Sequence, residues 1–399
     1  MILLAIILTA AVVYFVQSYI YKKHIFDNLF YDVSLSAREV FVGEDIFMYE
    51  EIVNAKRLPI SSVRVDMSLP HGLRFRMNDN TQRKKKEDSF IEYNQSVFVM
   101  RGNEKIRRRW RLSCQKRGVY RISKVVILTN DLLGLNSDSM PMEIRNSQKN
   151  NVVVLPRAID LEKHFTSSYF NSGDVIVMKS LLTDPMLISG SREYTSLDPM
   201  KAINWKSTAS HGKLMVNVED YTEVNRFNVI LNMQSRPIEL HVHEPSSPDY
   251  IEMCITVCAS ILDKVSADNI PIRLFMNTPP ESIGLSNDVD DETGKQILFT
   301  PVYKGKENIL EALRFLATLK LEISCQFDKM MDYISQNPYL YSDGGNIIIV
   351  SSYIDERMIN FHQAMGQRGI KVVFYVVTAN QNAIIIPDNI EVYFKTYIE

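Results

Sequence analysis

The pattern of apolar residues changes near residue 220, and this change limits the folds that the chain can adopt. Before it, short β-branched and aromatic runs follow one another with turn residues between them. After it, runs rich in Ile and Val alternate with amphipathic segments at helical spacing. At 399 residues the chain is also too long for one hydrophobic core. We therefore expect a multidomain protein with one all-β and one α/β domain.

Residues 31–150 predict an antiparallel β-sandwich of roughly immunoglobulin-like size. The candidate strands have no helical segments between them and are bounded by turn residues, such as those at 69–72 and 116–118. The expected strands cover residues 40–53, 63–69, 95–100, 107–113 and 119–128.

Residues 221–399 predict a doubly wound α/β domain. Near-continuous Ile and Val strands separated by amphipathic helices are typical of a parallel sheet that is covered on both faces. The expected strands are 226–233, 270–276, 346–352 and 370–377, and the expected helices are 249–267, 306–320, 322–335 and 355–368. Residues 151–220 are left as a connector between the two domains.

The chain starts with an apolar segment, because residues 2–21 contain no charge and are followed by Lys22, Lys23 and His24. About twenty helical residues at ~1.5 Å each match the ~30 Å core of a bilayer, so residues 1–24 are expected to form a transmembrane anchor. A cleaved signal peptide is the alternative, but no basic residue precedes the run and no Ala-x-Ala site ends it. The basic residues after the run place both domains in the cytoplasm, at the inner membrane, with the N-terminus outside.

Charge is unevenly distributed along the chain. Residues 31–150 contain about 22 Lys and Arg against about 15 Asp and Glu, whereas residues 221–399 contain about 14 against about 23. The basic excess includes residues 83–86 and 107–109, and a basic surface near a membrane attracts anionic lipid by ~1 kcal/mol per residue. A solvated loop and an alternating strand face are an equally open interpretation. No motif of a nucleic-acid-binding fold accompanies these residues, so nucleic acid is not an expected partner.

The window at residues 189–216 lies between the two regions and concentrates polar side chains that are costly to bury without partners. Within it, Asp198 and Pro199 are a typical helix start and Gly212 is a typical stop, so a short helix is expected from Pro199 to Ser210. The candidate site residues of the window are Arg192, Glu193, Tyr194, Asp198, Trp205, Lys206 and Lys213.

Three interpretations of this window are open. As a structural joint, Arg192 pairs with Asp198, Tyr194 and Trp205 fill the junction, and Lys206 caps the C-terminal end of the helix. As an interaction surface, the same side chains bind a partner. As an enzyme of unknown type, the protein uses Arg192, Asp198 and Lys206. Convergence of those three on an open pocket would favour chemistry, and mutual pairing would favour a joint.

The same window resembles the signature of a bacterial family labelled "domain of unknown function 58". The resemblance covers nearly the whole chain, although Leu197 stands where the family commonly has Gly, which leaves in doubt any backbone contact made there. The matching segments are Gly190-x-Arg192-Glu193-Tyr194, Asp198-x-x-x-x-Ile203-x-Trp205-Lys206-x-x-Ala209-x-x-Gly212-Lys213-Leu214-x-Val216, residues 54–70, Arg117-Gly-x-Tyr120 and Asp131-x-x-Gly134-Leu135.

The resemblance implies a membrane anchor, a sandwich and a C-terminal domain similar to von Willebrand factor A domains. Members of that family tend to be encoded beside MoxR-type AAA+ ATPases. The implied role is that of a membrane-anchored cytoplasmic adaptor that works with such an ATPase in the assembly or maturation of other proteins, without enzymatic activity of its own.

The comparison with A domains also implies where a metal would lie. A metal-dependent adhesion site needs Asp-x-Ser-x-Ser after the first strand, because a hard cation takes carboxylate and hydroxyl oxygens. This chain has Asn232, Gln234 and Arg236 at those positions, and the later strand ends at Ser352 without the expected acidic ligand. We expect a degenerate site that holds no metal, and no cofactor elsewhere.

Other chemistries find little support in the sequence. No nucleotide-binding glycine loop, His-Glu-x-x-His or Gly-x-Ser-x-Gly motif is present. Cys254 and Cys258 lie one helical turn apart and are expected to be buried side chains of a helix, not metal ligands. The acidic run at 288–292 is expected to be a solvated loop, since it lacks the spacing of a calcium loop. His241 and His243 are left unassigned.

Overall fold

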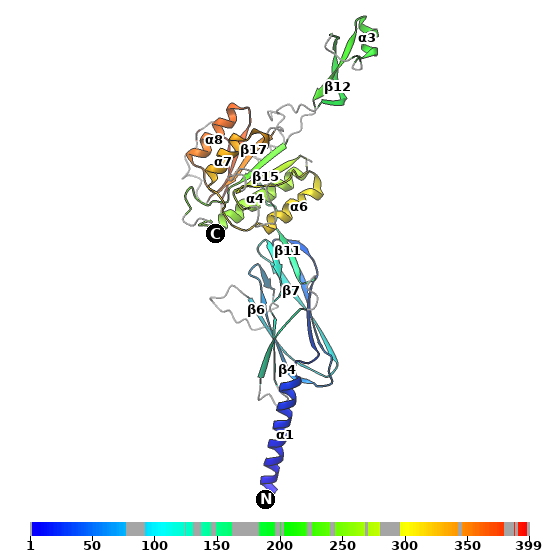
Figure 1. Cartoon of the computed structure of the whole chain (residues 1–399), viewed down its shortest axis with the longest axis vertical. Helices are drawn as coiled ribbons and strands as arrows, with labels where there is room; N and C mark the ends of the chain where they lie inside the picture. Colours follow the sequence, from blue (N-terminus) through cyan, green and yellow to red (C-terminus); the bar gives the residue numbers. More distant parts are fainter. Residues whose placement is uncertain are drawn as a thin grey trace. The chain divides into compact units, whose positions relative to one another are not determined.

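The computed structural model describes residues 2–76, 92–123, 125–130, 137–144, 149–161, 183–195, 200, 203–221, 226–239, 244–267, 270–279, 296–341, 345–378, 387 and 390–396. The chain divides into two compact units after Arg157 (Figure 1). Strand β11 (Asn151–Leu155) pairs with strands of the first unit. The sandwich therefore extends beyond residue 150, and the expected connector 151–220 starts too early.

The first unit begins with helix α1 (Ile2–His24), and the end of this helix packs into the sandwich core through Tyr21 and Ile25, which are 5% and 3% exposed. The expected helix is present and continues through the basic residues Lys22 and Lys23. Among the residues that the structure describes, no helix combines the length and the apolar character of a membrane-spanning segment. The expected transmembrane span is therefore not supported.

The sandwich consists of two antiparallel four-stranded sheets and a smaller three-stranded one, which confirms the expected all-β class. The strand orders are β1-β3-β7-β5, β10-β9-β4-β6 and β2-β11-β8. The bounds are β1 Leu29–Leu35, β2 Glu39–Phe41, β3 Asp45–Asn54, β4 Ile60–Leu69, β5 Leu73–Phe75, β6 Glu92–Met100, β7 Glu104–Cys114, β8 Gly118–Arg121, β9 Val125–Asn130 and β10 Ser137–Met142.

Two expected strands are each divided in two. The expected strand at 40–53 is split by a turn at Gly43, whose φ is 88°, into β2 and β3, which belong to different sheets. The expected strand at 119–128 likewise becomes β8 and β9. The buried faces of the two large sheets share one core, because alternate residues of β3 and β4 point inward, including Met48, Ile52 and Val65.

Alternation also sorts the basic residues of β7. Arg107 and Arg109 are exposed on the outer face, where their guanidinium groups lie over the rings of Tyr49 and Phe47 at 4.9 and 4.8 Å. Arg108 points inward and forms an ion pair of 2.8 Å with the buried Glu50. The expected basic surface at 107–109 is therefore made by two arginines, and the basic run at 83–86 lies outside the described residues.

The Arg117-Gly-x-Tyr120 segment forms a tight turn that depends on glycine. The Tyr120 hydroxyl donates to the carbonyl oxygens of Lys116 and Arg117, at 3.0 and 2.9 Å. Its ring lies so close to Gly72 that a Cβ there would approach the Tyr120 hydroxyl to 1.9 Å. Gly118, the glycine of the segment itself, has φ 150°, and a Cβ there would approach the Tyr120 ring to 3.0 Å, so this glycine is explained by its backbone conformation and by the same ring.

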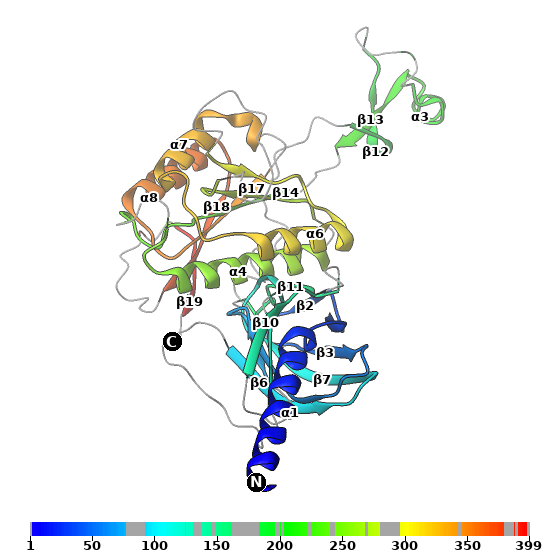
Figure 2. The ribbon, with the colours of Figure 1, turned by 60° about the horizontal axis from the view of Figure 1, so that its bottom comes forward.

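The second unit contains a six-stranded sheet in the order β16-β15-β14-β17-β18-β19, in which only the edge strand β16 is antiparallel. Helices α4 and α6 cover one face and α7 and α8 the other (Figure 2). The bounds are β14 Arg226–Leu231, α4 Pro248–Ala267, β15 Ile272–Met276, β16 Leu298–Phe299, α6 Gly305–Thr318, α7 Phe327–Gln336, β17 Gly345–Ser351, α8 Glu356–Gln367, β18 Val372–Thr378 and β19 Val392–Thr396.

This sheet agrees with the expected parallel α/β arrangement. All four predicted strands and all four predicted helices are present, although α7 begins five residues later than expected, at Phe327. The two-residue β16 and the C-terminal β19 were not expected, because neither carries a run of Ile and Val.

Candidate functional site

The signature window folds into a small module made of a β-hairpin and a helix (Figure 1). Strand β12 (Thr183–Glu193) pairs with β13 (Met215–Tyr221) in antiparallel fashion, and helix α3 (Trp205–His211) lies between them in sequence. We call these three elements the signature module.

Helix α3 starts later than the sequence indicated. Asn204 is its N-cap, and the side-chain oxygen of Asn204 accepts from the backbone N–H of Ser207 at 2.9 Å. The end of the helix is as expected, because Gly212 adopts φ 67° and its N–H bonds to the carbonyl of Thr208. The expected start at Asp198 and Pro199 lies outside the described residues, and within the described part of the expected helix Ile203 and Asn204 are not helical.

Hydrogen bonds and a few buried side chains hold α3 on the hairpin. The hydroxyl oxygens of Ser191 and Ser207 are 2.7 Å apart, and the Thr208 hydroxyl accepts from the N–H of Met215 at 3.0 Å. Ile203 and Val216 form a β-bridge and are 6% and 1% exposed. A seven-residue helix is too short to be stable alone, so these contacts determine where α3 lies.

Several signature side chains are exposed within this module. Trp205 is 68% exposed. Arg192 donates from Nη1 to the carbonyl of Glu193 at 3.2 Å, and the Glu193 carboxylate pairs with Lys213 at 2.6 Å. Lys206 lies in the first turn of α3 and therefore does not cap its C-terminal end.

The remaining candidates of the window are less informative. Tyr194 is half-buried, and its N–H donates to the carbonyl of Leu214 at 2.8 Å. Asp198 and Leu197 lie outside the described residues, so the expected pairing of Arg192 with Asp198 is not tested.

What the signature module offers is a mixed apolar and basic surface. Met200, Trp205 and Leu214 are 74%, 68% and 45% exposed. The same module carries the exposed cationic side chains of Arg192, Lys206 and Lys213. Its described carboxylate, that of Glu193, is already paired with Lys213. The hydrogen bond to Glu193 raises the pKa of Lys213, so the Lys213 ammonium group stays protonated at neutral pH. Exposed Trp with flanking cations is typical of a protein-binding surface.

A second candidate site lies at the carboxyl edge of the parallel sheet. Strand β14 is followed in sequence by β15 on one side and β17 on the other, so the strand order reverses next to β14. Ligands of open α/β sheets bind at such a switch point, outside the carboxyl ends of the strands. The positions that the sequence marked as a degenerate metal site, Asn232, Gln234, Arg236 and Ser352, all follow β14 or β17 here.

The polar side chains at this edge bind one another. The amide nitrogen of Asn232 donates to the hydroxyl of Ser351 at 3.1 Å, and its oxygen accepts from the N–H of Gln234 at 2.9 Å. The Ser352 hydroxyl donates to the carbonyl of Ser235 at 3.1 Å, while Arg236 is exposed. Asn232 and Ser351 are fully buried, so their hydrogen-bonding capacity is used within the protein.

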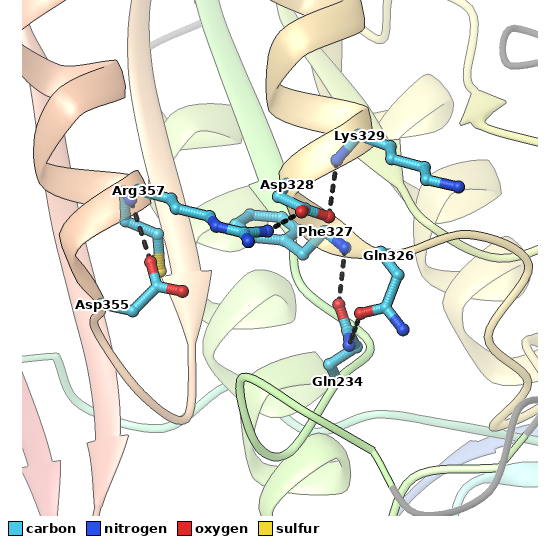
Figure 3. A network of polar contacts seen from close by, with 8 residues as sticks. Gln234, Gln326, Phe327, Asp328, Lys329, Asp355 and Arg357 are labelled. Carbon is cyan, nitrogen blue, oxygen red and sulfur yellow. Dashed lines mark hydrogen bonds and ion pairs between the residues drawn. The ribbon is translucent and has the colours of Figure 1, made fainter.

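Gln234 reaches from the β14 edge to the start of helix α7, as Figure 3 shows. Its side-chain oxygen accepts from the N–H of Phe327 at 2.5 Å, and its nitrogen donates to the side chain of Gln326 at 2.9 Å. Gln326 is the N-cap of α7 but makes no capping bond with its own side chain, so Gln234 supplies the acceptor. Beside it, Asp328 forms an ion pair with Arg357 of α8.

Glu239 holds the loop after β14 together. One oxygen accepts from the N–H and hydroxyl of Ser235 and from the N–H of Arg236, at 2.5, 2.8 and 3.2 Å. The other accepts from the N–H of Ser246 at 2.8 Å and from the Ser246 hydroxyl. Burial alone would raise the pKa of Glu239, but these hydrogen bonds outweigh it and hold the pKa below the usual value.

Sequence reasoning missed Glu239, Asn277 and Gln326. Asn277 follows β15, accepts from the N–H of Met233 at 2.8 Å and donates to the carbonyl of Cys325 at 3.1 Å. Its position after a strand neighbouring β14 was a usable signal, because the switch-point rule places such residues at one edge. Glu239 had no comparable signal, since its partners are backbone groups and serines of a loop.

The remaining metal candidates give no cluster in the described part of the chain. Cys254 and Cys258 are fully buried on α4, as expected, and burial raises the pKa of both thiols. No group of three His, Cys, Asp or Glu side chains lies together among the described residues. His241, His243 and the acidic run at 288–292 lie outside them.

Comparison with known proteins does not assign a family. No family matches the sequence, and no curated protein matches it. Solved structures similar to part of the chain include a CARDB domain from Pyrococcus furiosus (12% identity, 32% of this chain and 91% of that one, TM-score 0.20) and a non-cellulosomal cohesin from Archaeoglobus fulgidus (15%, 30% and 94%, TM-score 0.19). A type II cohesin domain from Acetivibrio cellulolyticus is similar at 10% identity, with 31% and 95% covered and a TM-score of 0.22. Such low scores carry no functional conclusion.

Proposed function

We propose that this protein is a membrane-attached adaptor that binds a MoxR-type AAA+ ATPase through its signature module and has no enzymatic activity of its own. The identity of the partner comes from the resemblance of the signature to the "domain of unknown function 58" family. The location and chemistry of the binding surface come from the exposed side chains of the module.

The exposure of Trp205 is the observation that carries the proposal. Trp205 is 68% exposed, and tryptophan is among the residues most often found at energetic centres of protein interfaces. Met200 and Leu214 extend the apolar area, and Arg192 and Lys206 add positive charge. The complementary surface on the partner is therefore an apolar pocket with acidic groups around it.

The enzyme alternative is less well supported. Chemistry by Arg192 and Lys206 would need them to converge on a pocket that excludes water. Arg192 bonds to a neighbouring backbone carbonyl, and both side chains are exposed. Exposed cations on a hairpin and a short helix suit recognition better than catalysis.

The α/β unit is proposed to be a von Willebrand factor A-like domain whose ligand edge has lost its metal chemistry. A parallel sheet with a switch point next to β14 supports this proposal. The positions expected to bind a cation carry Asn232 and Gln234, whose amides serve as internal hydrogen-bond partners. In this proposal the edge stabilises the fold and the signature module does the binding.

Attachment to the membrane is proposed to occur through α1. Its apolar side chains point in several directions and are widely exposed, among them Ile7, Val13 and Phe15 at 61%, 68% and 69%. A helix that is apolar on all sides is stable only when other apolar material surrounds it. Lys22 and Lys23 at its end favour a cytoplasmic location for both units.

The test is affinity capture of the full chain from native membranes, with the co-purified ATPase identified by mass spectrometry and by ATP hydrolysis. We expect a MoxR-type ATPase with the native chain and none with Trp205→Ala. Tyr339→Ala, which also removes an exposed aromatic ring, is the matched control and should retain the ATPase. Normal capture by folded Trp205→Ala and Arg192→Ala variants would show that the signature is only structural.

A further inference from the structure

Hydrogen bonds hold the end of helix α1 against one loop of the sandwich. The hydroxyl of Tyr21 donates to the carbonyl of Pro59 at 3.1 Å. The ammonium group of Lys56 donates to the carbonyl of Asp27 at 3.0 Å and also to that of Ile25, so the loop 55–59 is bound to the residues that follow the helix. The space between α1 and this loop therefore has a defined shape.

That space is a groove of about 360 Å³ that is open to the outside. Apart from Gln17, the side chains that line the groove are apolar or aromatic. Leu58 lines it from the loop, and the other residues line it from α1. Both polar atoms of the Gln17 side chain are buried and make no hydrogen bond with the described residues. The lining residues are Val12, Val13, Val16, Gln17, Ile20, Tyr21 and Leu58.

Two sandwich turns carry exposed basic side chains next to this groove. Asn54 joins the turns, since its side-chain nitrogen donates to the carbonyl of Leu58 at 3.0 Å and to that of Arg101 at 2.9 Å. Arg57 precedes the groove residue Leu58 and is exposed, as is Arg101. Lys22 and Lys23 are exposed directly after the groove residue Tyr21. We call Lys22, Lys23, Arg57 and Arg101 the basic collar.

Each of the three carboxylates near the collar has a partner other than a collar side chain. Asp27 is paired with His24 at 2.7 Å, and Glu104 accepts from the backbone N–H of Arg101 at 2.5 Å. Glu51 is paired with Lys105 at 2.7 Å. Four cationic side chains thus lie near one end of an apolar groove, with three carboxylates beside them that have other partners.

We propose that the groove and the basic collar form a binding site for one anionic phospholipid. An acyl chain fills the groove, the phosphate lies among the collar cations, and Gln17 meets the ester groups between them. Gln17 precedes Lys22 by five residues, which is ~7.5 Å along the helix axis, so the polar groups follow the order of a phospholipid from tail to head. The inference deepens the proposed membrane attachment and rests on it.

Native mass spectrometry of the full chain in mild detergent, with added phosphatidylglycerol or phosphatidylcholine of identical acyl chains, tests this proposal. We expect one retained phosphatidylglycerol and much weaker retention of phosphatidylcholine. A triple variant, Lys22→Gln, Lys23→Gln and Arg57→Gln, should bind phosphatidylglycerol on the order of a hundredfold more weakly, because each basic residue near anionic lipid contributes about fivefold.

The matched control is the triple variant Arg38→Gln, Lys116→Gln and Arg121→Gln. These exposed basic residues lie at the opposite end of the sandwich, beyond the ends of β1 and β7, and their loss should leave lipid retention unchanged. Leu58→Trp fills the groove and should weaken retention while the collar stays intact. Equal retention of both lipids, or full retention by the collar variant, would overturn the proposal, and so would a lipid-independent dimer that buries the groove.

Flotation of the full chain with vesicles separates this inference from the proposed function. Binding to vesicles of phosphatidylcholine alone, and to vesicles of equal parts phosphatidylcholine and phosphatidylglycerol, reports attachment through α1. If the chain floats with neither vesicle, the proposed membrane attachment is wrong and the lipid site falls with it. If it floats with both but shows no preference in mass spectrometry, only the lipid site is wrong.

Discussion

At the scale of single residues, the buried carboxylate of Glu50 on β3 distinguishes Arg108 from its neighbours on β7, because only Arg108 pairs with it. It is 2% exposed, accepts from the Tyr31 hydroxyl at 3.1 Å and from the Trp110 ring nitrogen at 2.9 Å, and pairs with Arg108. The sequence presented residues 107–109 as one basic run, and only the strand's alternation separates the inward Arg108 from its exposed neighbours.

Replacement of Arg108 by Ala should destabilise the sandwich by about 3–5 kcal/mol, because it leaves a buried carboxylate without its counter-charge. Arg107→Ala removes the same charge from the exposed face and should cost no more than about 1 kcal/mol. Denaturant unfolding of the two variants measures the difference. Equal losses would contradict the assignment of Arg108 to the interior.

Glu239 makes the stability of the second unit sensitive to acid. Its pKa is lowered in the folded state, so its contribution is complete above the unfolded value of ~4.3 and is lost as the pH falls through the lower folded pKa. Glu239→Gln should destabilise by about 1–3 kcal/mol at neutral pH, since several hydrogen bonds to a charged acceptor are weakened. The native chain and the variant should converge in acid, and a constant difference across denaturant curves at several pH values would contradict this account.

At the scale of elements, the limits of sequence reasoning are clear in α3 and in the carboxyl edge of the sheet. Long periodic helices such as α4 and the Ile- and Val-rich strand β17 were predictable, because their apolar pattern reflects burial that repeats along the element. The start of α3 was not, since Asp198 and Asn204 are both residue types that cap helices well and the sequence does not distinguish between them, whereas in the structure Asn204 is the cap of α3.

The cap of α3 can be tested directly. Asn204→Ala removes the acceptor for the Ser207 N–H and should cost α3 about 1 kcal/mol. Because the signature module is small, faster amide hydrogen exchange is expected in α3 and β13, with no change in the six-stranded sheet. Ser210→Ala, on the exposed part of the same helix, should leave exchange unchanged. Unaltered exchange in Asn204→Ala would show that α3 is held by other contacts.

The carboxyl edge of the sheet predicts indifference to divalent cations. Asn232 and Ser351 bond to each other, and the Glu239 carboxylate already accepts five hydrogen bonds. Mg²⁺ or Ca²⁺ should therefore leave the melting temperature unchanged. A functioning site at 100 times its dissociation constant would add about 2.7 kcal/mol, so a saturable rise in melting temperature would contradict a degenerate site.

At the scale of the whole molecule, sequence pattern predicted the two fold classes but not the arrangement of the signature. The structure contains the all-β sheets and the parallel α/β sheet on either side of the change near residue 220, but its two compact units divide after Arg157. The signature was expected between them. Whether it is a joint, a surface or a catalytic site stayed open, because polar residue types alone do not say whether the side chains face each other or solvent. The exposure of Trp205 is a property of the folded signature module and could not be deduced from the motif.

The central proposal is that the exposed surface of the signature module binds a MoxR-type ATPase. The most direct test is the affinity of the purified full chain for that ATPase, measured by titration calorimetry. We predict that Trp205→Ala weakens binding by at least about 2 kcal/mol, or roughly thirtyfold, with no loss of folding stability, because tryptophan at the centre of an interface contributes on that scale. Tyr339→Ala should bind as the native chain does. Unchanged affinity of a correctly folded Trp205→Ala variant would contradict the account.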